Sequence, residues 1–153
     1  MIVKKLVILL IIFFLSLGLE AVEGEPEQNL SQLAVELSQI DPAEKGNLII
    51  KVFYDEASWD DDSPNQKIII EELKPELLFS LQLPQELDSL ALQIIHDANK
   101  NGKMDFRIFP FPKPTEGIGL SNNYFRKGRP RFSDSEFFIS ESSAKISIEM
   151  NYF

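Results

Sequence analysis

The chain has 153 residues, 24 acidic against 15 basic side chains, a formal charge of -9 and no cysteine. A surface this acidic repels polyanions, so nucleic acid and anionic membrane surfaces are excluded as expected partners and cations are favoured. The lack of cysteine excludes disulfides, thiol nucleophiles and zinc–thiolate sites. The fold must therefore be held by packing, or by packing and a metal ion.

Residues 1–21 have the pattern of a secretory signal peptide. Two lysines precede an unbroken apolar run, 6–15, and small residues follow it. The run is short for a membrane span, and acidic residues come soon after it. We expect a secreted protein, periplasmic or extracellular, with cleavage after Gly18 or Ala21. The chain would contact the membrane only through this segment, if it stayed uncleaved.

The rest of the chain is expected to form a flexible lead-in, 22–32, and a single β-sandwich domain, 33–153. The domain would be large enough for its own core. Apolar residues alternate with polar ones, and 55–66 reads as an acidic loop. Strands are predicted at 33–38, 47–54, 67–72, 77–83, 90–96, 132–140 and 145–152. About seven short strands without a long helical period indicate an all-β fold, an antiparallel sandwich.

The segment that follows the fifth predicted strand has the spacing of a calcium loop. Oxygen-bearing side chains recur at every second residue, and Gly102 permits a sharp turn. Calcium takes six to eight oxygen ligands, and a loop coiled around the ion presents alternate side chains inward. The predicted ligands are the side chains of Asp97, Asn99, Asn101 and Asp105 and the carbonyl of Lys103.

A further ligand is expected from Glu116. The helix-loop-helix calcium motif supplies a bidentate glutamate where this chain has Ile108, and Glu116 is the first carboxylate downstream. Glu116 has a second interpretation as a surface turn residue. The whole segment 97–105 has one as well, because Asn, Asp and Gly are the ordinary residues of tight turns.

Other polar residues each allow a functional and a structural interpretation. His96 is the only histidine and is expected to be a packed or orienting residue, because no Gly-x-Ser-x-Gly elbow accompanies it. The glycines of 117–119 would let a tight loop lie against the calcium loop, with 121–123 bonding to its backbone. The acidic run 60–62 is a second cation site or a solvated loop, and the basic run 126–131 is an anion contact or a solvated loop.

Three motifs occur together: His96-Asp97-x-Asn99-x-Asn101-Gly102-x-x-Asp105, Pro114-x-Glu116-Gly117-x-Gly119-x-Ser121-Asn122-Asn123, and Pro130-x-Phe132-x-Asp134-x-x-Phe137. In this combination the chain, over 33–152, resembles a bacterial family of small secreted proteins designated domain of unknown function 2141. The resemblance implies an immunoglobulin-like or prealbumin-like sandwich and no established activity. The chain departs from the family pattern at 87–91 and at Ile118, which stands where an aromatic residue is usual.

Two functions remain open. The first is a calcium-stabilised binding or structural module that meets a polymer or protein of the cell envelope. The second is a hydrolase of envelope polymers in which Asp105 and Glu116 act as acid and base or hold a catalytic metal. An enzyme would show a concave pocket with a perturbed acid, whereas a module would show a closed ion site and no pocket. The single histidine and the lack of a nucleophile motif favour the module.

Overall fold

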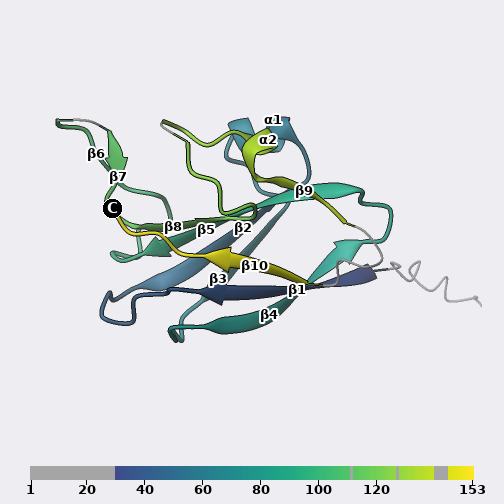
Figure 1. Cartoon of the computed structure of the whole chain (residues 1–153), viewed down its shortest axis with the longest axis horizontal. Helices are drawn as coiled ribbons and strands as arrows, with labels where there is room; N and C mark the ends of the chain where they lie inside the picture. The colour runs from purple at the N-terminus through teal and green to yellow at the C-terminus, as the bar shows by residue number, and fades with distance from the viewer. Residues whose placement is uncertain (1–29, 111, 127, 140–144) are drawn as a thin grey trace, which may run out of the picture.

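The computed structural model describes residues 30–110, 112–126, 128–139 and 145–153. Within these residues the chain forms mostly strands and two short helices (Figure 1). The elements are β1 (Leu30–Ser38), β2 (Asn47–Phe53), α1 (Glu56–Asp60), β3 (Gln66–Ile70), β4 (Leu77–Pro84), β5 (Ser89–Asp97), β6 (Phe106–Arg107), β7 (Lys113–Pro114), β8 (Gly117–Leu120), α2 (Phe132–Ser135), β9 (Glu136–Phe138) and β10 (Lys145–Glu149).

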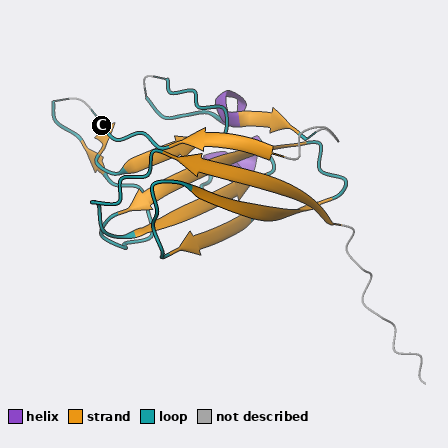
Figure 2. Ribbon diagram, turned by 60° about the horizontal axis from the view of Figure 1, so that its bottom comes forward, coloured by secondary structure: helices purple, strands orange, loops and turns teal. Residues whose placement is uncertain are grey.

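Two sheets pack face to face, as Figures 1 and 2 show. The smaller sheet has the order β10-β1-β4, and the larger has the order β3-β2-β5-β8 with β9 also paired to β5. All pairs are antiparallel except β1 with β10, which run parallel with Ala34 opposite Lys145. The predicted all-β sandwich is confirmed, with one parallel pair that the prediction did not contain.

The core between the sheets follows the predicted alternation. Leu33, Val35 and Leu37 of β1 are buried, and they meet Leu48, Ile50 and Val52 of β2 together with Leu90, Leu92 and Ile94 of β5. Apolar side chains at every second position thus all enter one layer. Removing that area from water is the main force that holds the sandwich together.

A second, smaller cluster covers the outer face of the larger sheet, where α1 and α2 lie (Figure 1). Trp59 of α1 packs edge-on against Phe53, with ring centroids 5.0 Å apart, and against Phe132 of α2 at 6.3 Å. Because both faces of the larger sheet are covered, every residue of β2 is buried. The prediction that 55–66 is wholly a loop is therefore wrong at α1. The carboxylate of Asp55 caps this helix by accepting from the Ser58 N–H at 2.8 Å.

Other predicted boundaries also shift. Segment 132–140 was expected to be one strand, but its first four residues form α2, and of the described residues up to 139 only 136–138 form a strand. β6, β7 and β8 were not predicted, since strands of two to four residues are too short to show a strand period, and β7 and β8 also contain proline or glycine. β1 begins at Leu30, so residues 30–32 of the expected lead-in belong to the sheet and pair with β4.

The expected signal peptide, 1–21, and the lead-in up to residue 29 lie outside the described residues. In the part of the chain that is described, no helix has the length and apolar character needed to cross a membrane.

Candidate functional site

The segment predicted to bind calcium begins where β5 ends. Asp97 is the last residue of β5, lies opposite Asn47 of β2 in the ladder and is 1% exposed. Gly46, with a φ of +124°, brings the preceding turn against the backbone of Asp97 and Ala98. Asp97 is therefore held rigidly, as expected from its place at the end of a strand.

The carboxylate of Asp97 organises the turn of the loop. Its Oδ1 accepts from the Asn101 N–H at 3.0 Å, and its Oδ2 accepts from the Gly102 N–H at 2.7 Å. Gly102 has a φ of +83°, a left-handed conformation that glycine adopts without a steric penalty. A buried carboxylate and a glycine together close the loop on itself.

The other predicted side chains converge on Asp105. Its Oδ2 accepts from Asn99 Nδ2 at 2.6 Å and from Asn101 Nδ2 at 2.8 Å. The amide oxygens turn back to the loop, where Asn99 Oδ1 accepts from the Asn101 N–H at 2.9 Å and Asn101 Oδ1 from the Lys103 N–H at 3.0 Å. The structure thus brings these residues together, with the amide nitrogens facing the carboxylate.

Glu116 belongs to the same unit. It is 5% exposed, and its Oε1 accepts from the Ala98 N–H while its Oε2 accepts from the Asp105 N–H, both at 3.0 Å. These bonds join the first and last turns of the loop, so the surface-turn interpretation of Glu116 is wrong. Burial raises the pKa of Glu116, and the charges of Asp105 and Asp97 raise it further, although the two backbone N–H groups oppose the shift.

The loop has features of both interpretations that the sequence left open. Its own hydrogen bonds close it, as in a plain turn. It also gathers three carboxylates and two amides, and an ionised carboxylate has about four acceptor positions, of which Asp97 uses two. Across the described ranges, no three His, Cys, Asp or Glu side chains are arranged to hold a metal ion by themselves. An ion here would need the amide oxygens and the Lys103 carbonyl as well.

His96 is a packed residue on the opposite face of β5 from Asp97. It is fully buried, and its Nδ1 lies 2.8 Å from the hydroxyl of Tyr152. Ser121 Oγ accepts from the Leu92 N–H at 3.0 Å and donates to the carbonyl of Ser135. Ser121 and His96 therefore have separate structural partners and do not form a nucleophile–base pair.

The glycines of β8 were expected to let a tight loop lie against the calcium loop; Thr115 and Glu116 do contact that loop, but the glycines themselves approach the C-terminal segment. A Cβ on Gly117 would lie 2.7 Å from Cζ of Tyr152, and one on Gly119 would lie 2.9 Å from Cγ2 of Ile148. These glycines let the C-terminal segment pack directly against β8. Close approach of a neighbouring segment, here mainly of its side chains, is a common reason for glycine within a strand.

The residues after β8 also do not bind the loop. Asn122 Nδ2 donates to the carbonyl of Glu136 at 2.7 Å. Asn123 Oδ1 accepts from the Glu149 N–H at 2.8 Å, and its Nδ2 donates to the carbonyl of Ser147 at 3.0 Å. The second motif therefore ties the loop-bearing sheet to β9 and β10.

The model of a family described as "Uncharacterized protein conserved in bacteria (DUF2141)" matches residues 35–147, most of the sandwich. The chain belongs to this family. No curated protein and no solved structure matches it. The immunoglobulin-like or prealbumin-like part of the fold expectation therefore stays a prediction.

The charged runs of this DUF2141 protein have specific partners. Asp62 of the acidic run pairs with the buried Lys51, with Nζ 2.7 Å from Oδ1. In the basic run, Arg126 pairs with Asp134 at 3.4 Å, and Arg129 Nη2 donates to the carbonyl of Asp60 at 2.8 Å. Through these contacts, Asp62, Arg126 and Arg129 belong to the layer that covers the larger sheet. The interpretation of the two runs as solvated loops did not include such contacts.

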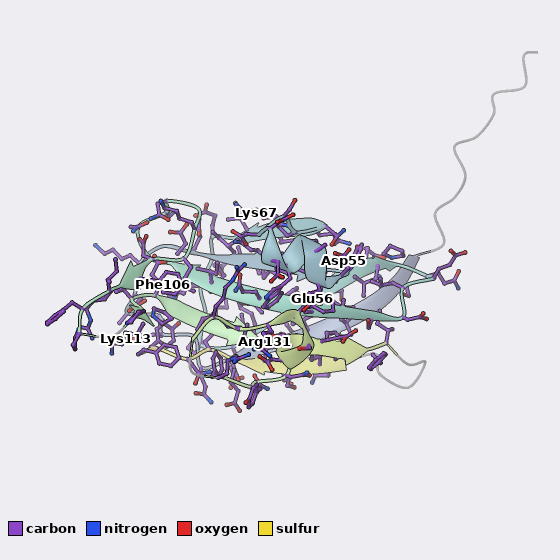
Figure 3. All side chains as sticks on the ribbon, turned by 90° about the horizontal axis from the view of Figure 1, so that it is seen from above. Asp55, Glu56, Lys67, Phe106, Lys113 and Arg131 are labelled. Carbon is purple, nitrogen blue, oxygen red and sulfur yellow. The ribbon has the colours of Figure 1, made fainter. Side chains whose placement is uncertain are left out.

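A cavity of about 1050 Å³ opens beside that layer, and no pattern in the sequence had indicated it. Its floor is the outer face of the larger sheet, one wall is the β6–β7 hairpin, and the other is the segment that leads into α2. In Figure 3, Phe106 and Lys113 mark the hairpin at one end of the molecule, and Arg131 marks the start of α2. Lys103 lines this cavity, but Asp105 and Glu116 do not.

Proposed function

We propose that this DUF2141 protein is a secreted binding or structural module of the bacterial cell envelope, and that its loop 97–105 binds calcium. The observation that carries the ion site is the convergence of Asn99 and Asn101 on Asp105, with donor–acceptor distances of 2.6 and 2.8 Å. Amide side chains at alternate positions thus meet one carboxylate, and alternate positions are those that a loop coiled around a hard cation uses.

Ion binding would need only local change. In the present arrangement the amide nitrogens, as donors, satisfy the negative charge of Asp105. Turning both amides over would bring their oxygens beside Asp105 in place of the nitrogens, and a cation would then take the place of the donated hydrogens. Asp97, Asp105 and Glu116 supply the negative charge, and the carbonyl of Lys103 adds a neutral oxygen.

The secreted location rests on the sequence of residues 1–21, whose pattern is that of a signal peptide. A periplasmic or extracellular protein meets calcium at concentrations that a modest site can use, and extracellular calcium modules bind at about 10⁻⁴ to 10⁻³ M. The expected partners are a polymer or a protein of the envelope.

The alternative is a hydrolase of envelope polymers that uses Asp105 and Glu116. Two observations favour it: a cavity is present, and burial raises the pKa of Glu116. However, both oxygens of Glu116 accept backbone N–H groups of the loop, and neither carboxylate lines the cavity. An acid that cannot reach a bound substrate cannot transfer a proton to it. The binding module is therefore the better account of this geometry.

The test is a thermal melt of residues 22–153 in excess calcium and in chelator, with Asp105→Asn and the matched exposed variant Asp61→Asn. An ion at about a hundred times its dissociation constant adds roughly 2.7 kcal/mol to the stability, equivalent to a rise of roughly 8–12 °C for a domain of this size. We expect this rise in the parent and in Asp61→Asn, and its loss in Asp105→Asn. Identical melting curves in calcium and in chelator would mean that the loop is a plain turn that does not bind calcium.

A further inference from the structure

We propose that the cavity beside the β6–β7 hairpin binds an organic anion of small-molecule size, with an apolar body and one acidic group. The proposal deepens the binding role proposed above and does not require that the calcium site be occupied. At about 1050 Å³, the cavity is slightly larger than the range of about 300–1,000 Å³ that is usual for small-ligand sites.

The walls of the cavity are chiefly apolar and suit the body of such a ligand. Aromatic rings, aliphatic side chains and prolines come from all the surrounding segments. They are Phe53, Trp59, Met104, Phe106, Pro112, Pro114, Ile118, Phe125, Pro130 and Phe153. Moving an apolar ring or chain from water into this lining is favourable by the same effect that builds the core.

The charged groups at the cavity are almost all positive, although the whole chain carries a formal charge of -9. Among the residues that the structure describes, the basic side chains that line it are Lys51, Lys103, Lys113, Arg126 and Arg129, and the acidic side chain is Asp62. A local excess of one charge sign in a cleft attracts ligands of the opposite charge. The ligand should therefore be an anion.

Some of these cations already have partners, and others do not. Asp62 neutralises Lys51 at 2.7 Å, and Asp134 lies 3.4 Å from Arg126. Lys103 and Lys113 have no carboxylate within 4.0 Å among the residues that the structure describes. These two lysines, both on the hairpin side, are the groups that would receive the acidic group of the ligand.

The cavity is held open by the fold. On one side, Trp59 Nε1 donates to the carbonyl of Pro130 at 3.1 Å, and Arg129 Nη2 donates to the carbonyl of Asp60, so this wall is fixed to α1. On the other side, the Thr115 N–H donates to the carbonyl of Asp105 at 3.0 Å and fixes the hairpin to the loop. A site held in this way loses little entropy when a ligand enters.

The chain contains its own reporter, because Trp59 is the only tryptophan and lines the cavity. The probe is 8-anilinonaphthalene-1-sulfonate, and its matched control is N-phenyl-1-naphthylamine, which has the same rings without the sulfonate. Energy transfer from Trp59 measures the binding of each. We expect one saturable site that binds the sulfonate probe roughly tenfold more tightly than the neutral one.

Four variants assign the site. Lys103→Gln and Lys113→Gln should each weaken the sulfonate probe roughly three- to tenfold and leave the neutral probe unchanged. Lys67→Gln, an exposed lysine of β3 outside the cavity, should change neither. Gln93→Phe, which fills the floor, should weaken both probes. Displacement of the probe by dodecanoate would assign an acyl body to the ligand, and displacement by 1-naphthoate alone would assign an aryl body.

The proposal is overturned if the two probes bind with equal affinity or if energy transfer from Trp59 does not saturate. It is also overturned if Lys67→Gln weakens the sulfonate probe as much as Lys103→Gln and Lys113→Gln do. Circular dichroism of every variant ensures that a folded protein is compared. Running the titration in calcium and in chelator separates the two proposals. Saturable sulfonate binding without any effect of calcium on the melt would overturn the ion site alone, and the reverse result would overturn the anion cavity alone.

Discussion

Gly46 gives the sharpest test of how the loop is positioned. This glycine precedes β2 with a φ of +124°, and a Cβ there would lie 2.7 Å from Cα of Ala98 and closer still to the carbonyl oxygen of Asp97. Both neighbours are backbone atoms, so no side chain can rotate away. Gly46→Ala must therefore displace either the turn or the start of the loop.

The expected cost comes from comparison with Gly102, which also has a positive φ, +83°, but has no atom within 4 Å of an added Cβ. Gly102→Ala pays only for the left-handed backbone, about 1–2 kcal/mol. Gly46→Ala has a conformational cost of at least this size, because its φ of +124° lies further from the left-handed region open to L residues, and a steric cost of about 1–3 kcal/mol for the backbone shift. The total for Gly46→Ala is about 2–5 kcal/mol.

Urea unfolding in the presence of chelator measures both variants by linear extrapolation. Chelator removes any contribution of a bound ion, so the difference reports packing alone. We expect Gly46→Ala to be less stable than Gly102→Ala by at least about 1 kcal/mol. Equal midpoints would show that the turn does not press on Asp97, and that the rigidity of the loop has another origin.

Three other perturbations test the packing around the site. Asp62→Asn should lower the free energy of unfolding by about 1–2 kcal/mol, because it leaves the buried ammonium of Lys51 without its half-exposed carboxylate partner. Lys51→Met should lower it less, since no unpaired charge is left behind. The reverse order in urea melts would argue against the ion pair. Burial raises the pKa of Tyr152 above its ordinary value of 10.0, so the unfolded chain ionises first and stability should fall as the pH rises through 10 towards the folded pKa. Tyr152→Phe should lack this loss, and an absorbance titration that shows all tyrosines ionising together would contradict the assignment. Gly119→Ala should lower the free energy of unfolding by about 1–3 kcal/mol, because its Cβ would lie 2.9 Å from Cγ2 of Ile148. A thermal midpoint like that of the parent would mean that β8 and β10 can move apart without cost.

The strands were predictable where one face is buried and the other is solvated. In β1 the alternation of Leu33, Val35 and Leu37 with more exposed neighbours directly gives the strand and its inward face. The same pattern could not reveal α2 or β8. Phe132 is buried within a single helical turn closed by Asp134, whose Oδ2 accepts from the Arg131 N–H at 3.3 Å, and such a turn is too short to show a period.

The candidate loop was predictable in position because its spacing is local. Asp97 and Gly102 close the turn as the pattern required. The contact of Glu116 with the loop was expected only from its order in the chain, and its role in binding two backbone N–H groups needed the tertiary structure. The cavity could not be predicted, because Lys51, Trp59 and Lys113 come from separate segments and share no sequence pattern.

The loop and the cavity are joined by a short stretch of chain, and this connection explains why a binding module would hold an ion away from its ligand. Lys103 and Met104 lie within or beside the proposed calcium ligands and also line the cavity. The carbonyl of Asp105 accepts from the Thr115 N–H at 3.0 Å, so both ends of the β6–β7 hairpin are attached to the loop. An ion that fixes 97–105 would therefore also fix the wall that carries Lys113. An ion that orders the loop would thereby also order the anion-binding side of the cavity. It could affect ligand binding in this way although Asp105 and Glu116 do not line the cavity.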